Sequence, residues 1–336
     1  MVGVDVVIPC YQYGRYLRDC VTSVLSQGID QVRVLIIDNA STDNSVEVAR
    51  QLASEDNRVQ VVANQRNVGA TASFNAGIEW ASAEYFVELD ADDLLAPGCL
   101  KRALSAMQAH PNISFTYGIE AFVLPDGSMQ VHSGHSEAAA WKIQSGREFI
   151  AEICRLPKNY VGAPTVVRRT SAQKLAGYYR PELPYTDDLE MWLRLASVGD
   201  VANISRMQGI RRIHELQMSS DYRNRMVRDF TEREAAFKSF FANEGRSVRG
   251  ADKLLEQAVD SLAEHAYWSA VSHFLRGYFR DSGQLFKFCL SRRPGAAIFP
   301  PIGWLLRTDR PFSRAEQVLR DAVRRRRASG NRRGAT

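Results

Sequence analysis

Cysteine is scarce in this sequence and never closely paired. The chain of 336 residues has five cysteines, an odd number, and no two of them form a CxxC pair. A secreted domain held together by disulfides has an even set of cysteines, and a structural zinc site needs closely spaced ligands. Both classes are therefore excluded, and a reducing cytosol is the predicted compartment.

Long apolar runs are also missing. The longest, AAIFPPIGWLL at 296–306, contains two prolines, and a membrane-spanning helix needs about 20 apolar residues. The first residues, MVGVDVVIPC, have no basic region, and Asp5 interrupts their apolar run. They predict a first β-strand and not a signal peptide. Hydrophobic residues make up 45% of the chain, enough for one large α/β domain or a medium domain with an appendage.

Excess positive charge is absent from most of the chain. The net charge is +5, but residues 310–336 hold nine arginines against Glu316 and Asp321, which leaves the rest at −2. We predict a basic tail at 310–336 that suits an anionic membrane surface or nucleic acid. A solvated, disordered chain end has the same composition.

Apolar strands alternate with segments of helical periodicity through the first half of the chain. The predicted strands are 5–10, 32–38, 59–64, 85–90, one within 110–118, and 210–214. The predicted helices include 71–81, one opening at Pro97, 146–156, 187–197, and a helical region from about 220 that is interrupted by DSG at 281–283. This alternation predicts a doubly wound, mostly parallel α/β sheet with a C-terminal helical appendage.

Polar clusters follow three of the predicted strands. They are PCYQYG after the first strand, DNASTD after the second and DADD after the fourth. In doubly wound sheets, ligands bind beyond the carboxyl ends of the strands. We therefore predict one site, lined by Pro9, Tyr11, Asp38, Asp90, Asp92 and Asp93.

The stretch VELDADDLLAP at 87–97 places three carboxylates within four residues and no basic residue beside them. Such a cluster repels itself unless water screens it or a cation lies between the carboxylates. Hard oxygen ligands suit Mg²⁺ or Mn²⁺, which also bind phosphate oxygens. The alternative is a set of helix caps that lead into the next helix.

Six segments in register resemble family-2 glycosyltransferases of the GT-A fold. They are VVIPCYQYGRYLRDCVTSVLSQ, VLIIDNASTDNSVEVA, RNVGATASFNAGI, VELDADDLL, TDDLEMWLRLASVGD and RRIHELQMS. The resemblance covers residues 3 to 220. It implies a Rossmann-like nucleotide-binding half, an acceptor half, and a metal-dependent glycosyltransferase of the hexosyltransferase type.

The resemblance also implies roles in donor binding. The implied donor-binding residues are Pro9, Tyr11, Asp38, Asn67, Gly69, Asp90, Asp93 and Glu190. Pro9 and Tyr11 would border the base and ribose of the nucleotide, Asp38 would hydrogen-bond the base, and Asp90 would contact the ribose. A UDP-sugar is the favoured donor.

The resemblance implies roles in metal binding and catalysis for three further residues. Asp92 and His214 would hold Mn²⁺ or Mg²⁺, and Asp188 matches the catalytic base. The chain departs from the family pattern at three places. Asn39 stands where a second aspartate is common, Phe74 where an arginine is frequent, and Asp187 where the family has glutamate. The arginine's absence puts a diphosphate contact at Phe74 in question.

The implied chemistry is glycosyl transfer with inversion. A metal can neutralise the charge that develops on a nucleoside diphosphate leaving group. An acceptor hydroxyl is a poor nucleophile until a base takes its proton, and Asp188 would be that base. One base without a protein nucleophile predicts inversion at the anomeric carbon.

Two other functions share some of these features. A nucleotidyltransferase that makes activated sugars would also use carboxylate-bound Mg²⁺, but the first predicted loop, PCYQYG, has one glycine and no basic residue. A nucleic-acid-binding protein could act through the arginine tail, but without 310–336 the chain is slightly acidic, so no nucleic acid is expected as a partner.

The predicted domains are a glycosyltransferase domain at 1–220, a helical region at 221–309 and the basic tail at 310–336. A glycan or lipid-linked glycan of bacterial surface polysaccharide is the expected acceptor. The tail and the apolar run IFPPIGWLL predict a cytoplasmic protein in peripheral contact with the inner face of the membrane.

Overall fold

The computed structural model describes residues 3–131, 133–214 and 226–307. The chain divides into two compact units. One comprises Met1–Ile150, Asn159–Gln217 and Ala242–Arg249, and the other comprises Ala151–Lys158, Met218–Phe241 and Gly250–Thr336. The predicted boundary at 220 and the predicted tail at 310–336 lie outside the described residues.

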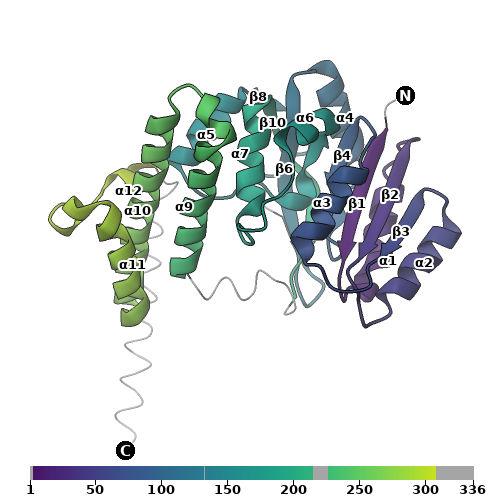
Figure 1. The fold of residues 1–336 in the computed structure, drawn as a ribbon, viewed down its shortest axis with the longest axis horizontal. Coiled ribbons are helices and arrows are strands. Elements are labelled where there is room, and N and C mark those ends of the chain that lie inside the picture. Colours follow the sequence, from purple (N-terminus) through teal and green to yellow (C-terminus); the bar gives the residue numbers. More distant parts are fainter. Residues whose placement is uncertain (1–2, 132, 215–225, 308–336) are drawn as a thin grey trace, which may run out of the picture. The chain divides into compact units, whose positions relative to one another are not determined.

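Four parallel strands form the nucleotide-binding half expected from the sequence. In sheet order they are β3 (Val59–Ala63), β2 (Val32–Asp38), β1 (Val4–Cys10) and β4 (Tyr85–Glu88), side by side in Figure 1. β1, β2 and β4 are mainly apolar because helices cover such a sheet on both faces. The strand order reverses between β1 and β4, and ligands bind at such switch points.

Three helices connect these strands, and the register aligns the strand ends. The helices are α1 (Gly14–Leu25), α2 (Ser45–Glu55) and α3 (Ala70–Trp80). Cys10 at the end of β1 is the register partner of Asp38 at the end of β2. The loops after both strands therefore begin at the same level of the sheet.

The same sheet continues beyond β4 with mixed strand directions. The further strands, in sheet order, are β9 (Val167–Arg169), β6 (Ile113–Val123), β10 (Asp200–Arg212) and β5 (Leu94–Leu95), with β7 (Met129–Val131) on β6 and β8 (Lys142–Gln144) on β10. β6 and β10 run parallel, and the other pairs in this half are antiparallel. The hairpin predicted at LPDGSM is the turn between β6 and β7.

The helices and short 3₁₀ turns of this half complete the first unit. They are α4 (Cys99–Ala109), α5 (Gly146–Arg155), which passes into the second unit, η1 (Ala163–Thr165), α6 (Thr170–Ala176), α7 (Asp187–Ser197) and η2 (Glu244–Ser247). Phe115 of β6 stacks on Trp192 of α7 at 5.7 Å between ring centroids, and Phe149 meets it edge-on at 5.5 Å. This aromatic core fixes α7 against the sheet and so positions the acids at its N-terminus.

The second unit is helical. Its elements are α9 (Met226–Ala242), α10 (Ala251–Leu275), α11 (Phe279–Arg292), η3 (Pro294–Ala297) and α12 (Gly303–Arg307). Figure 1 shows α10 and α11 beside each other, and Phe230 of α9 packs on His265 of α10 and Phe288 of α11. None of the helices in the described parts has the length and apolarity to pass through a bilayer.

Most predicted elements are confirmed, and three details were wrong. The helix expected to open at Pro97 begins at Cys99, after Gly98 in a left-handed conformation with φ of +70°. The break predicted at 281–283 lies at Gly277, with φ of +83°, and DSG is inside α11. β10 extends far beyond the predicted 210–214, because bulges let a polar stretch pair with β6. All five cysteines are free and buried.

Candidate active site

The loops after β1 and β2 are tied together by side-chain hydrogen bonds. The backbone N–H of Gln12 donates to Ser41 Oγ at 3.0 Å, and its side-chain amide donates to Thr42 Oγ1 at 2.7 Å. Gln12 and Ala40 both have positive φ, +63° and +60°. Non-glycine residues rarely adopt this conformation, so both loops are held in shapes that sequence propensity disfavours.

Asp38 ends β2 with one carboxylate oxygen unused. Oδ2 accepts a hydrogen bond from the backbone N–H of Ser41 at 3.0 Å, whereas Oδ1 is buried and finds no partner among the described residues. A buried acceptor without a donor costs free energy. Pro9, half-buried, and Tyr11, 45% exposed, belong to the adjoining β1 end. The site can therefore accept a hydrogen bond from a ligand at this point.

Asn39 organises the loop that carries two predicted donor residues. Its Nδ2 donates to Asn67 Oδ1 at 2.8 Å, while its Oδ1 accepts from the backbone N–H of Val68 at 2.9 Å. Asn67 Oδ1 also accepts from Gly69 N–H at 2.9 Å, and Gly69 has a φ of +88°. An aspartate at 39 could not donate to Asn67, so this departure from the common family pattern has a local structural reason.

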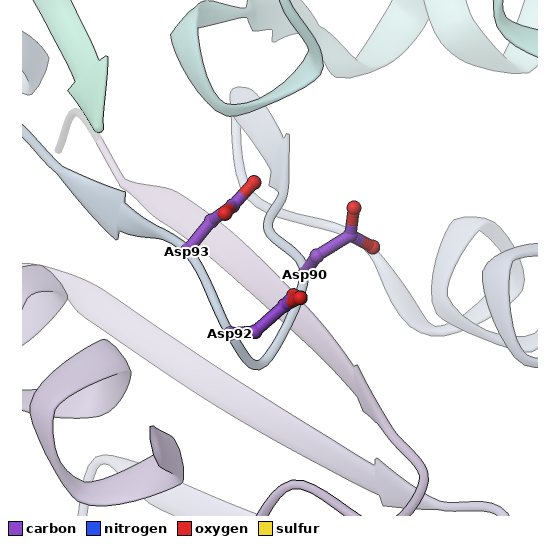
Figure 2. Close-up of side chains that lie close together, drawn as sticks. All are labelled: Asp90, Asp92 and Asp93. Carbon is purple, nitrogen blue, oxygen red and sulfur yellow. The ribbon is translucent and has the colours of Figure 1, made fainter. Parts of the chain in front are cut away.

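Asp90, Asp92 and Asp93 project from one turn between β4 and β5 (Figure 2). The turn is closed by a hydrogen bond from the backbone N–H of Asp93 to the Asp90 carbonyl at 2.9 Å. One oxygen from each carboxylate lies within 4.8 Å of the others. Asp92 and Asp93 are buried, and Asp90 is exposed.

Proximity and desolvation make full ionisation of this cluster costly. The pKa of Asp90 is raised to about 7. Desolvation by the surrounding protein is the largest cause, and the negative charges of Asp92 and Glu88 add to it. Burial, followed by the charges of Asp92 and Asp90, raises the pKa of Asp93 well above its usual range. Arg211 opposes both shifts. Its own guanidinium donates to Glu120 Oε1 at 2.8 Å, so its charge is shared.

His214 follows β10 and reaches the cluster. Its Nε2 lies 2.9 Å from Asp92 Oδ2, and its buried Nδ1 has no hydrogen-bond partner in the described parts. Tyr13 and Tyr16 enclose the imidazole, with ring centroids at 5.6 and 5.2 Å. Residues 215–219 of the predicted closing motif lie outside the described residues. Three carboxylates and an imidazole form a donor set that fits Mn²⁺ or Mg²⁺.

Asp188 lies in the first turn of α7, where the helix dipole favours negative charge. Asn159 Nδ2 donates to Asp188 Oδ2 at 2.5 Å, and the backbone N–H of Leu189 donates to Oδ1 at 2.6 Å. Burial nevertheless raises the pKa of Asp188, and the pKa of Asp187 is raised to about 8 by burial and the Asp188 charge. Asp188 is close enough for its charge to raise the pKa of Asp90.

Glu190, predicted to contact the donor, is fully buried and bonded to two arginines. It forms ion pairs with Arg180 and with Arg194, whose Nε donates to Oε2 at 2.8 Å. Arg180 also reaches Glu244 at 2.7 Å. The structure thus places the Glu190 carboxylate within a buried salt-bridge network.

Sequence reasoning missed a second buried network beneath the site. Arg168 on β9 donates to Glu88 Oε2 at 3.0 Å and to the Tyr179 hydroxyl at 2.8 Å. Phe74 packs on Tyr179 at 5.5 Å between ring centroids, and Asn75 exchanges two hydrogen bonds with the Tyr179 backbone. Phe74, where the family resemblance led us to expect an arginine, therefore serves packing. No short-range pattern links residues this far apart in sequence.

Comparisons with known proteins agree with this architecture. The profile of the family Glycosyl transferase family 2 matches residues 5–175. An uncharacterised glycosyltransferase of Haemophilus influenzae is 23% identical over 222 residues, 65% of this chain and 68% of that protein. The chondroitin synthase of Pasteurella multocida is 26% identical over 211 residues, 63% of this chain but only 20% of that enzyme.

Solved structures of S. aureus TarS 1-349 share the fold. The likeness has a TM-score of 0.60 at 15% identity and covers 98% of this chain and 92% of that chain. The same protein has been solved in complex with UDP, at a TM-score of 0.59, and with UDP-GlcNAc, at 0.55. This likeness supports the predicted GT-A fold with a helical C-terminal region. Because the family profile covers more than half of the chain, the protein belongs to glycosyl transferase family 2 and is a glycosyltransferase.

Proposed function

We propose that the protein transfers a sugar, with inversion, from a nucleoside-diphosphate sugar to an acceptor hydroxyl. The observation that carries the proposal is the convergence of Asp90, Asp92 and Asp93 within 4.8 Å, with Asp188 in electrostatic range. The protein supplies no arginine or lysine salt bridge to these four acids in the described parts of the chain. Such an arrangement suits a cation and a diphosphate that arrive together.

The donor nucleotide would bind where β1 and β2 end. The unused Oδ1 of Asp38 suits the imino N–H of uracil, and Tyr11 and Pro9 would border the ring. Asn67 and Gly69 would line the nucleotide and sugar from the adjoining loop. UDP is the favoured nucleotide because TarS, which shares the fold, has been solved with UDP and UDP-GlcNAc.

Asp92, with Asp90, Asp93 and His214, would hold a divalent cation. A bound Mn²⁺ or Mg²⁺ would neutralise the charge that develops on the diphosphate leaving group. The residues of the chain would have two further roles. They would position the diphosphate at the switch point of the sheet and hold a base on the opposite side of the donor sugar.

Asp188 would act as that base. As the acceptor oxygen bonds to the anomeric carbon and the bond to the diphosphate breaks, the hydroxyl proton passes to the Asp188 carboxylate. The pKa of Asp188 is raised by burial, which brings it nearer to the pH at which a general base works well. Direct attack by the hydroxyl in one displacement inverts the anomeric configuration.

A glycan or lipid-linked glycan is the proposed acceptor, in the synthesis of a bacterial surface polysaccharide. Relatives named as chondroitin synthase support a polysaccharide role, although this chain spans only a fifth of that enzyme. A lipid-linked acceptor would bring the enzyme to the inner face of a membrane. The charge of residues 310–336 suits such a surface.

Calorimetric titration with UDP tests the donor site. Wild type should bind UDP more tightly when Mn²⁺ is present, and Asp92→Ala should weaken the metal-dependent binding by at least about 10- to 100-fold, the cost of losing a residue that only supports a metal ligand. Glu55→Ala, which removes an exposed carboxylate at the end of α2, just before β3 begins and so at the opposite end of the parallel strands, is the matched control and should bind like wild type. Wild type that binds neither UDP nor dTDP under either condition would overturn the proposal.

A further inference from the structure

The segment that follows η3 and includes α12 exposes four large apolar side chains. Ile298 is 75% exposed, Phe299 77%, Ile302 63% and Leu306 79%. They lie within nine consecutive residues, and we refer to these four side chains as the apolar platform. Singly exposed apolar residues are common on protein surfaces, but a contiguous group usually marks a binding surface.

The platform rests on a firmly packed base. Between its residues, Trp304 is only 4% exposed and stacks on His265 of α10 at 4.2 Å between ring centroids. Trp268 Nε1 donates to the Pro301 carbonyl at 2.6 Å, and Arg307 binds Ser261 and Glu264 of α10. The segment therefore has an inner face that is fixed to α10 and an outer face that is apolar.

The outer face has helical geometry at its C-terminal end. The backbone N–H of Leu306 donates to the Ile302 carbonyl at 3.2 Å, which places these two residues one turn apart. Residues four apart lie on the same side of a helix. Trp304 points to the packed side, so Ile302 and Leu306 together face outward. This is the arrangement of a short amphipathic segment.

Positive charge surrounds the platform in sequence. Residues 276–307 contain six basic residues and one acid, Asp281. Buried acids of the same unit already hold some of them, since Glu234 pairs with Arg292 and Glu264 pairs with Arg293 and Arg307. Arg280 and Lys287 of α11 are exposed and make no ion pair within the described residues. Their charge is available to an external anion.

We propose that the apolar platform inserts into the surface of a lipid bilayer that carries anionic headgroups. The four side chains would enter the boundary between headgroups and acyl chains, and the exposed Arg280 and Lys287 of α11 would attract the lipid phosphates. A second protein is a weaker fit, because a standard interface buries about 800 Å² on each partner and four side chains fall short of that. The proposal is independent of the sugar, the nucleotide and the assignment of the base.

Sedimentation with vesicles tests this surface on the full chain. Wild type should bind vesicles of phosphatidylcholine mixed with phosphatidylglycerol, and the binding should weaken as salt is raised. The double variant Phe299→Ser, Leu306→Ser should bind these vesicles at least about tenfold more weakly, because both side chains would leave the bilayer. Leu175→Ser, which changes a side chain of matched 74% exposure in the first unit, should bind like wild type.

Two results would overturn the proposal. One is a wild type that does not bind the anionic vesicles, and the other is a double variant that binds them as tightly as wild type. Light scattering distinguishes lipid binding from self-association. If wild type is a dimer, and the double variant is a monomer that still binds vesicles, the platform contacts a second copy of the chain. Thermal melting of the same samples shows whether the double variant is folded. UDP titration shows whether its donor site still works, so that loss of lipid binding can be told from either failure. If the double variant does not fold, Phe299→Ser alone replaces it.

Discussion

The acids of the first unit fall into two groups, which differ in whether they have arginine partners. Glu88 and Glu190 are met by arginines, Glu88 by Arg168 at 3.0 Å and Glu190 by Arg180 and Arg194. The cluster on the turn after β4 and Asp188 on α7 form no salt bridge with an arginine or lysine among the described residues. The charge of Arg211, which is itself bonded to Glu120, acts on Asp90, Asp93 and Asp188 from a distance.

The contrast separates structural carboxylates from functional ones. A buried carboxylate that helps to hold the fold needs a partner built into the fold, since an unpaired buried charge is costly. Carboxylates that are crowded without such a partner lower stability, and that cost is tolerated where a ligand later supplies the missing charge. By this criterion we expect Glu88 and Glu190 to organise the site and the other acids to act in it.

The largest predicted effect is on turnover when Asp188, in the group without arginine partners, loses its charge. Asp188→Asn keeps the shape and the contact with Asn159 but removes the base. Turnover should fall by about 10²–10⁴-fold, the usual contribution of a general base. The UDP dissociation constant, measured by calorimetry, should stay close to that of wild type. Turnover within a few fold of wild type would contradict the role of Asp188.

Substitution of an acid that is paired with arginines should lower stability. Glu190→Gln leaves Arg180 and Arg194 without their shared carboxylate, and breaking such a buried pair costs about 3–5 kcal/mol of unfolding free energy. Urea denaturation measures it. Glu55→Gln, which breaks the exposed pair with Arg18, should change the free energy of unfolding little. Folded Glu190→Gln that binds UDP normally supports a structural role, and folded protein that has lost UDP binding would restore the predicted donor contact.

The sequence predicted the strands and the acids well because both depend on local pattern. β2 at 32–38 and α7 at 187–197 have the predicted bounds, since apolar runs and acids in a first helical turn are short-range signals. Arg194 could also have been found, because it lies four residues after Glu190.

Sequence patterns could not predict those partners of the acids that come from distant segments. Arg168 is 80 residues from Glu88, and Asn159 is 29 residues from Asp188. Only the folded sheet brings such residues together. Periodicity and motif spacing thus identify the acids, and the tertiary structure is needed to tell which of them have partners.

Asn159 offers an intermediate test, since it holds Asp188 without neutralising it. Its hydrogen bond to Oδ2 lowers the pKa of Asp188 and fixes the orientation of the carboxylate. Asn159→Ala should reduce turnover by about tenfold, because a misplaced base is less effective, and should shift the acidic limb of the pH–rate profile upward. UDP affinity should not change. An unshifted pH–rate profile would show that Asn159 does not position Asp188.

The smallest predicted effect concerns stability and pH. Burial and the Asp188 charge raise the pKa of Asp187 to about 8, so between about pH 4 and pH 8 the folded protein binds more protons than the unfolded chain, and stability falls as pH rises. In metal-free buffer, the melting temperature of wild type should therefore be lower at pH 8.5 than at pH 6, and Asp187→Asn should reduce that difference by a few degrees. Asp43 has a lowered pKa, so Asp43→Asn should lower the melting temperature by a similar amount at both pH values. If Asp187→Asn keeps the pH dependence of wild type, desolvation of Asp187 does not limit stability, and the cost of the acids without arginine partners must lie in Asp188 or in the cluster of Asp90, Asp92 and Asp93.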